Sequence, residues 1–187
     1  MQIVPTRLNG PLLLKPVVHA DERGFFQETF RQDQFAEFGL PEELVFVQEN
    51  HSRSSRGVVR GMHFQVGNGI AKLVRCARGA IVDVVVDVRR GSPHYGQWES
   101  FDLDDCDHHQ LLIPVGFAHG FCVISEVADV LYSQTGYYDP EFERGIAYND
   151  PDLAIHWPLR GDDLISSKRD AEAPRLKDLA DALPFTY

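Results

Sequence analysis

Cysteine, basic residues and long uncharged runs are all scarce in this chain of 187 residues. Cys76, Cys106 and Cys122 are odd in number and match neither a Cys-x-x-Cys pair nor a zinc ribbon, so we expect reduced, mostly packed thiols in a cytoplasmic protein. The chain does not open with a basic segment followed by an apolar one, and the longest run without Asp, Glu, Lys or Arg, 108–125, contains Pro114. These features argue against a secretory leader and against a membrane span.

The charge balance excludes one class of partner. Eighteen Lys and Arg residues against 28 Asp and Glu residues give a formal net charge of −10. Nucleic-acid binding depends on a basic face that neutralises phosphates, and a body this acidic is unsuited to it. A few arginines that converge in a cleft can still bind a small anion. We therefore expect no nucleic-acid partner and keep an anionic small molecule open.

Short apolar segments separated by turn residues dominate the chain. Its length and its 43% hydrophobic content predict a single domain over residues 1–187. Many short strands with close turns are typical of an all-β sandwich or barrel of the jelly-roll type. We expect strands at 12–18, 44–48, 71–76, 80–88, 98–103, 110–113, 121–124 and 127–132.

Helical patterns are confined to two segments. Residues 32–38 carry phenylalanines on one face and are followed by Gly39 and Pro41, which stop a helix. An apolar stripe of helical spacing runs between Pro174 and Pro184. We expect this C-terminal helix to pack on the outside of the barrel.

Two carboxylates interrupt the valine-rich strand at 80–88. Because aspartate is rarely fully buried, the simpler interpretation is that Asp83 and Asp87 face solvent. The alternative is a buried strand face that carries a carboxylate, or an edge of the strand that faces a cavity.

Histidines occur at two places that matter in cupin barrels. The segment from Pro114 to His119 is similar to the Pro-x-Gly-x-x-His turn that aims a histidine into the mouth of such a barrel. Metal-binding cupins carry an earlier His-x-His, whereas this chain has His63 followed by Gln65. A three-ligand site needs histidine or carboxylate there, so we expect no metal. A metal-dependent cupin, an oxygenase or a sugar-phosphate isomerase, stays as an alternative that depends on the two histidines alone.

A more specific resemblance comes from motifs that occur in order between residues 11 and 174. They include Asp21-x-Arg-Gly24 with Glu28, Gln48-x-Asn50-x-Ser52, Gly57-Val-x-Arg-Gly-x-His63-Phe-Gln, Lys72-Leu-Val, Pro114-x-Gly-Phe-Ala-His-Gly-Phe121, Tyr132, Glu143-Arg-Gly145 and Asn149-Asp-Pro-Asp152. This ordered set resembles the dTDP-4-dehydrorhamnose 3,5-epimerase family, which has a cupin-type jelly roll. The resemblance implies an isomerase that converts dTDP-4-dehydro-6-deoxy-D-glucose to dTDP-4-dehydro-L-rhamnose without a cofactor.

The implied chemistry sets clear requirements. Loss of a proton at C3 or C5, beside the ketone, gives an enolate, and reprotonation from the other face inverts the centre. The reaction needs a base, an acid on the opposite face and a cation or donor at the developing oxyanion. His63 suits the base because an imidazole titrates near neutral pH. Tyr132 suits the acid, with a pKa lowered by a nearby cation, and Lys72 suits the oxyanion.

The resemblance assigns the remaining roles. It implies that Asp170 orients His63 and that His119 adds a hydrogen bond at the keto oxygen. It also implies substrate contacts, with arginines as forks for the diphosphate, from Arg23, Glu28, Gln48, Asn50, Arg60, Glu143 and Arg169. The family usually shows Ser-x-Lys-Asp near its end, and here either Lys168 or Arg169 can supply that cation. The resemblance further implies a homodimer whose N-terminal segment crosses to the partner.

Two other interpretations stay open. A relative of this family can invert only C3 or only C5 of a related dTDP-4-keto-6-deoxy sugar from another deoxysugar pathway, using the same base. A non-catalytic module can bind a sugar nucleotide without any proton transfer. Binding alone does not require a base, an acid and an oxyanion cation together, which disfavours the second interpretation.

Overall fold

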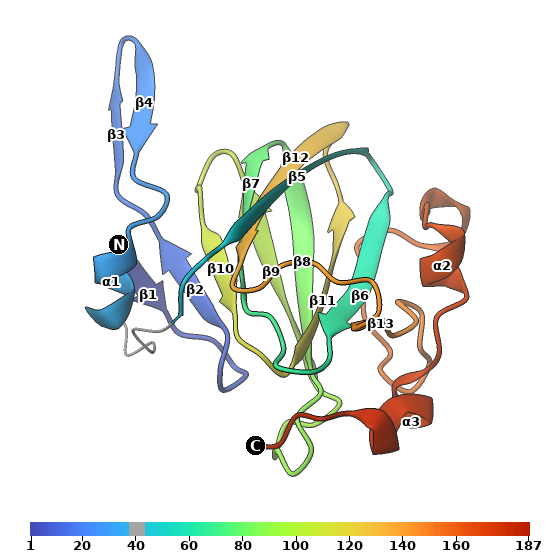
Figure 1. Ribbon diagram of the computed structural model, residues 1–187. Helices are drawn as coiled ribbons and strands as arrows, with labels where there is room; N and C mark the ends of the chain where they lie inside the picture. Colours follow the sequence, from blue (N-terminus) through green and yellow to red (C-terminus); the bar gives the residue numbers. More distant parts are fainter. Residues whose placement is uncertain (38–43) are drawn as a thin grey trace.

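The computed structural model describes residues 1–37 and 44–187. Within these residues, two antiparallel sheets of six and five strands pack face to face as a barrel (Figure 1). Across the larger sheet the order is β1 (Gln2–Val4), β2 (Leu12–Lys15), β10 (Gln110–Ile113), β7 (Lys72–Arg78), β12 (Val127–Gln134) and β5 (Gln48–Ser55). Across the smaller sheet it is β13 (Glu143–Gly145), β6 (Val59–Gln65), β11 (Phe117–Val123), β8 (Ala80–Asp87) and β9 (Trp98–Asp104). Most neighbours are not consecutive in the chain, as in a jelly roll, which confirms the expected fold class.

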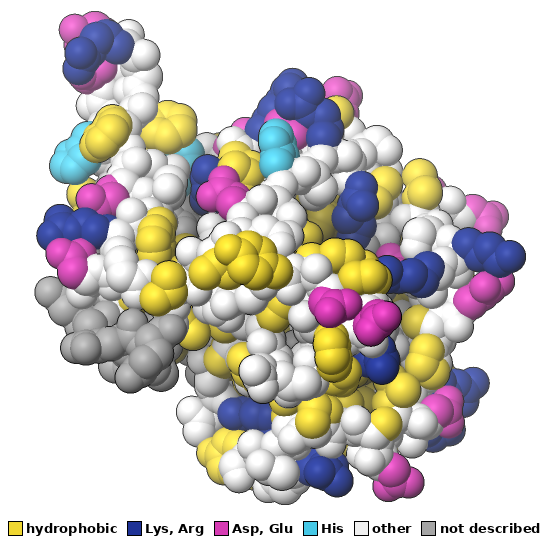
Figure 2. All heavy atoms as spheres, in the orientation of Figure 1, with side chains coloured by type: hydrophobic (Ala, Val, Ile, Leu, Met, Phe, Trp, Pro, Cys, Tyr) yellow, Lys and Arg dark blue, Asp and Glu magenta, His cyan; other side chains and the backbone are white. Residues whose placement is uncertain are grey.

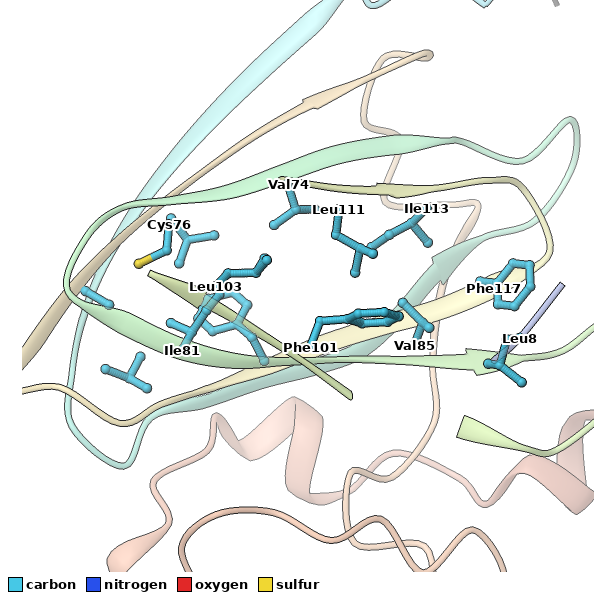
Figure 3. Packing of buried hydrophobic residues seen from close by; sticks show 14 residues of the cluster. Leu8, Val74, Cys76, Ile81, Val85, Phe101, Leu103, Leu111, Ile113 and Phe117 are labelled. Atoms are coloured by element: carbon cyan, nitrogen blue, oxygen red, sulfur yellow. The ribbon is translucent and has the colours of Figure 1, made fainter. Parts of the chain in front are cut away.

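An apolar core fills the space between the two sheets. Figure 3 shows side chains of the larger sheet, such as Val74 and Leu111, facing Ile81, Val85 and Phe101 of the smaller one. These side chains belong to one cluster of buried residues. Alternate residues of a strand point to the same face of the sheet, so each strand contributes residues from every second position to this cluster.

The outer face of the five-stranded sheet is also covered. Val84 and Val86 point outward and pack against a second cluster that includes Leu176, Leu183 and Phe185 of the C-terminal segment. β8 is therefore buried on both faces, which explains its nearly continuous run of valines. The interpretation that its carboxylates face solvent is wrong, because Asp83 and Asp87 are both 0% exposed.

The helices are short. Helix α1 (Gln32–Glu37) forms where expected, whereas the expected stop at Gly39 and Pro41 lies outside the described residues. Helix α3 (Leu176–Leu179) lies within the predicted C-terminal segment and continues as a 3₁₀ turn (Ala180–Ala182). A further short helix, α2 (Lys168–Ala171), was not expected, and it stands beside the barrel in Figure 1.

Apart from an end residue of β3 and of β5, the expected strands do not include β1, β3 (Val18–Asp21), β4 (Gly24–Gln27), β5, β6 or β13. For β5 and β6 the physical reason is the same. β5 has no apolar residue, and β6 contains Gly61 and several polar side chains, so neither shows the apolar alternation of a half-buried strand. The expected strand at 44–48 reaches regular pairing only from Gln48 onward, and the one at 12–18 breaks after Lys15. The expected strand at 110–113 is confirmed with the same bounds, and those at 71–76, 80–88, 98–103, 121–124 and 127–132 are confirmed with shifted ends.

A hairpin projects from the barrel. Its strands are β3 (Val18–Asp21) and β4 (Gly24–Gln27), and its tip extends beyond the barrel in Figures 1 and 2. The ring of Phe25 lies 4.5 Å from that of His108, measured between centroids. Phe25 and Phe26 on β4 are 58% and 71% exposed, which is unusual for side chains of this size.

Candidate active site

A cavity of about 690 Å³ opens between the two sheets at the end of the barrel next to α2. Its walls combine apolar side chains with convergent polar ones, the usual composition of a small-molecule site. The polar lining residues are Ser52, Arg60, His63, Gln65, Lys72, His119, Tyr132, Gln134, Tyr138, Glu143, Ser166, Ser167, Arg169 and Asp170.

An irregularity in β6 brings two of these residues to the same side. His63 pairs with His119 on β11, and Arg60 pairs with Phe121, so β6 has one more residue than its partner between these pairs. Residues three apart in a regular strand point to opposite faces, whereas this bulge lets Arg60 and His63 both line the cavity. Gly61 is required here, because its φ is +128° and a Cβ would lie 2.4 Å from the Cα of Gly120.

His63 is held by a carboxylate from the C-terminal segment. Its Nε2 lies 2.7 Å from Oδ1 of Asp170, a residue that is only 5% exposed. Ser167 begins helix α2 and accepts a hydrogen bond at 3.1 Å from the backbone N–H of Asp170. Burial acts to raise the pKa of Asp170, but the contact with His63, the backbone N–H of Gly61 and the charge of Arg169 together hold this pKa below the usual value. The ionised carboxylate fixes the ring with Nε2 as the donor, which leaves the lone pair of a base on Nδ1.

A second histidine and a lysine lie deeper in the cavity. Nε2 of His119 lies 2.8 Å from Oδ2 of Asp83, and burial lowers the pKa of this histidine. The ammonium group of Lys72 donates a long hydrogen bond, 3.5 Å, to the carbonyl of His63. Burial lowers the pKa of Lys72 to about 8, while Glu143 and Asp83 act to raise it. Lys72 is therefore a cation at neutral pH that can face an oxyanion.

Tyr132 enters the cavity from the opposite sheet. It lies on β12 of the six-stranded sheet, whereas His63 lies on β6 of the five-stranded one. Burial, and then the charge of Glu143, raise the pKa of Tyr132. The expectation of a lowered pKa is therefore wrong: Arg60 acts in that direction but is outweighed. Tyr132 keeps its proton at neutral pH, so it can act as a proton donor.

Charged side chains line the rim. Arg169 forms a 2.6 Å ion pair with Glu143, which also accepts a 3.0 Å hydrogen bond from the hydroxyl of Tyr138. The contact with Arg169, together with the charge of His63, keeps the pKa of Glu143 below its usual value although burial raises it. Of the two candidate cations on α2, Arg169 lines the cavity, while Lys168 is 86% exposed and pairs with Glu172.

Gln48 and Asn50 adjoin the cavity without lining it. Asn50 pairs with Tyr132 and Gln48 with Gln134 across the β5–β12 ladder, so their side chains share the inner face of the sheet. Gln48 donates a 3.0 Å hydrogen bond to Asn50. Nε of Arg60 donates a 3.0 Å hydrogen bond to the hydroxyl of Ser54.

Arg23 and Glu28 do not join this cavity in the single chain. Arg23 lies at the turn of the projecting hairpin, where it pairs with Asp21, and Glu28 is an exposed residue just after β4. The sequence motifs could not reveal this separation, since they give order along the chain and no distance.

Several lining residues were assigned no role from the sequence, although Ser52 stands in one of the motifs. Ser52 and Gln134 occupy inner positions of β5 and β12, and the two-residue spacing from Asn50 and Tyr132 was the available signal. Ser167 acts through the helix that it begins. In the described ranges, no three His, Cys, Asp or Glu side chains are placed to hold a metal ion, and no helix is long and apolar enough to cross a membrane.

Comparison with known proteins points to one family. A family model described as dTDP-4-dehydrorhamnose 3,5-epimerase matches residues 5–178. A dTDP-4-dehydrorhamnose 3,5-epimerase of Pseudomonas aeruginosa is 48% identical over 182 residues, which cover 96% of this chain and 98% of that protein. One of Neisseria gonorrhoeae is 49% identical over 168 residues, 90% of this chain, but the match spans only 51% of its length.

A solved structure agrees with these relatives. The dTDP-6-deoxy-D-glucose-3,5-epimerase of Legionella pneumophila, in complex with dTDP-4-keto-L-rhamnose, superposes with a TM-score of 0.94. It is 43% identical and covers 100% of this chain and 98% of its own. A barrel of this shape thus binds a nucleotide-linked keto sugar.

Proposed function

Because the chain belongs to the dTDP-4-dehydrorhamnose 3,5-epimerase family and is therefore an isomerase, we propose that its cavity epimerises a dTDP-linked keto sugar. The substrate is dTDP-4-dehydro-6-deoxy-D-glucose and the product is dTDP-4-dehydro-L-rhamnose. One observation carries the proposal: His63, held by Asp170, and Tyr132 line one cavity from opposite sheets. A base and an acid on two sides of a sugar ring are what inversion requires.

The proton moves in two steps at each centre. His63 takes the proton next to the ketone, and the electrons of the broken C–H bond move to the C4 oxygen. Lys72 stabilises the resulting enolate oxygen with its positive charge, and His119 contacts the substrate beside it. Tyr132 then donates its proton to the opposite face of the same carbon, which forms the new C–H bond. No electron leaves the substrate, so the reaction needs no redox cofactor.

The diphosphate has suitable partners at the rim. We assign it to Arg60 and Arg169, whose planar guanidinium groups match phosphate oxygens. In the structure Arg169 forms an ion pair with Glu143. The diphosphate would take the place of the Glu143 carboxylate as the partner of the Arg169 guanidinium group. Glu143, Gln48 and Asn50 then serve the sugar, ribose or base.

The projecting hairpin suggests how Arg23 and Glu28 contribute. Both lie away from the cavity of their own chain, on or beside a hairpin that exposes Phe25 and Phe26. We propose a homodimer in which this hairpin packs against the partner and carries both residues to the partner's cavity. Burial of the two phenylalanines would favour that association.

Two simpler expectations complete the proposal. The described residues form one barrel with one such cavity between its sheets, which supports a single epimerase domain over residues 1–187. All three cysteines are free, Cys76 and Cys122 being buried and Cys106 exposed. Free thiols of this kind suit the reducing cytoplasm, where we place the protein.

Isotope exchange tests the proposal. The protein is incubated with the substrate in D₂O, and NMR follows deuterium at C3 and C5. We expect exchange at both positions with the wild-type chain and none with a folded His63→Gln variant. Exchange at one position only, with NMR of the reduced product showing one inverted centre, would identify a single-centre epimerase. Ligand binding without any exchange would contradict catalysis, and a stoichiometric transition metal in active protein would favour the metal-dependent alternative.

A further inference from the structure

Asp83 is a buried charge for which the reaction described above has no direct use. It lies on the inner face of β8, is 0% exposed and does not line the cavity. Burial raises the pKa of its carboxyl group, which means that its negative charge costs free energy at this position. A carboxylate in the middle of a valine-rich strand therefore calls for an explanation.

The contacts of Asp83 lead to two cavity residues. Oδ2 lies 2.8 Å from Nε2 of His119, on the adjacent strand β11. The charge of Lys72, which comes from the opposite sheet, also acts on Asp83 and favours its ionised form. Oδ1 has no hydrogen-bond partner among the described protein atoms. One carboxylate thus contacts His119 and interacts electrostatically with Lys72, and both of these residues line the cavity.

Resting on the function proposed above, we propose that Asp83 is a positioning residue that serves His119 and Lys72 together from behind the cavity. Its Oδ2 accepts the Nε2–H of His119, so that the ring presents Nδ1 to the substrate. Its charge keeps Lys72 in the cationic form that stabilises the enolate oxygen. A serine or asparagine could bond to His119, but only a carboxylate supplies the charge.

The other charged neighbours are few and can be separated from this effect. Lys72 responds to Glu143 as well as to Asp83, and burial opposes both. His119 responds to Lys72 and His63 in addition to Asp83. Glu143 lies at the rim and is already paired with Arg169, so a change at Asp83 leaves that contact in place.

The pH dependence of kcat in an Asp83→Asn variant tests the proposal. Asparagine keeps the shape of the side chain and removes the charge. Lys72 then loses a favourable interaction, so the fall of kcat at alkaline pH moves to lower pH by about one unit or more. A purely structural role would lower kcat by the same factor at every pH, and a curve without that shift would overturn the proposal.

Asp87→Asn is the matched control. Asp87 is also fully buried on β8, but its partners are Arg89 and Ser92, which do not line the cavity. We expect its alkaline limb to stay at the wild-type pH, whatever the loss of stability. A shift equal to that of Asp83→Asn would show that any buried charge on this strand has the effect, and would contradict the proposal.

A second measurement needs no folded Asp83 variant. Nitrogen-15 NMR of histidine-labelled wild-type protein, assigned with His119→Gln, reports which ring nitrogen of His119 carries the proton. We expect a protonated Nε2, and a proton confined to Nδ1 would overturn the proposal. Failure of the proposed function has a different sign: the wild-type chain would show no deuterium exchange at C3 or C5. The nitrogen-15 signal of His119 would still report whether Asp83 accepts the Nε2–H.

Discussion

Two histidine–aspartate pairs face the same cavity, yet their surroundings differ. In the pair at the mouth, the side chains of His63 and Asp170 are 24% and 6% exposed, and the carboxylate comes from a short helix 107 residues away along the chain. In the deep pair, His119 and Asp83 are 7% and 0% exposed and lie on adjacent strands. A base must return its proton to solvent after each turnover, so the exposed pair suits proton transfer and the sealed pair suits a fixed charge pattern.

The electrostatics of the two carboxylates follow this division. The pKa of Asp170 lies below its usual value, because its contacts with His63 and Gly61 and the charge of Arg169 together outweigh its burial. The pKa of Asp83 is raised, because burial dominates although the interactions with His119 and Lys72 act to lower it. The same pair of residue types can therefore serve as a catalytic dyad or as an internal counter-charge, depending on access to water.

Replacing each histidine by glutamine gives the largest contrast. His63→Gln removes the base, and we expect kcat to fall about 10⁴-fold. His119→Gln removes one polar contact to the substrate, and we expect a loss of about 10²-fold. Steady-state kinetics with NMR detection of the product measures both, after circular dichroism has confirmed folding. A larger loss from His119→Gln would reverse the roles assigned to the two pairs.

Asp170→Asn separates orientation from proton transfer. The asparagine no longer fixes Nε2 of His63 as the donor, so the base is present but poorly held, and we expect kcat to fall about 10²-fold with little change in KM. Glu172→Gln is the control, since Glu172 contacts Lys168 on the exposed side of the chain. Unchanged kcat in Asp170→Asn would mean that His63 needs no partner.

Gly61→Ala tests the bulge that sets His63 beside Arg60. A Cβ at Gly61 would lie 2.8 Å from the carbonyl oxygen of His119 and still closer to Gly120, so β6 and β11 must separate. We expect a loss of about 2–3 kcal/mol in the free energy of unfolding, measured with denaturant. Gly24→Ala has a similar positive φ, +120°, with nothing within 4 Å, and should lose only about 1 kcal/mol. Equal losses would show that backbone conformation alone decides, without the close approach.

The pH profile of the wild-type chain gives the smallest effect. Lys72 has a pKa of about 8, so its charge is present below that pH and is lost above it. We expect kcat to be about fourfold lower at pH 8.5 than at pH 7. Lys72→Arg keeps its charge throughout and should lack this alkaline limb, whatever its overall activity. A limb at the same pH in Lys72→Arg would assign it to another group.

The sequence indicated residues that line the cavity more clearly than the strands that carry them. His63, Lys72, His119 and Tyr132 stood out because polar residues interrupt apolar segments, and the same interruption hid β5 and β6 from a search for apolar alternation. A strand that lines a polar cavity loses the pattern by which strands are recognised. Where a strand carries polar site residues in place of core residues, the site is therefore easier to predict from the sequence and the strand is harder to predict.

Other features depend on three-dimensional proximity that the sequence does not contain. The rarity of buried aspartate predicts a solvent-facing Asp83, and only the fold shows its burial and the two basic residues, His119 and Lys72, that act on it. Which of Lys168 and Arg169 lines the cavity depends on the face of helix α2 on which each residue lies, and the sequence does not show which face is turned to the cavity. Arg23 matches the family motif but lies outside the cavity of its own chain.

The most direct test of two-sided proton transfer is the fate of deuterium in a Tyr132→Phe variant. This variant keeps His63 and loses the acid on the opposite sheet, so the base should exchange the protons at C3 and C5 with D₂O and return them to the same face. We predict deuterium in recovered substrate of unchanged configuration, with little inverted product, when NMR follows the reaction. Inverted product formed at the wild-type rate would show that the proton arrives from elsewhere and would contradict this account.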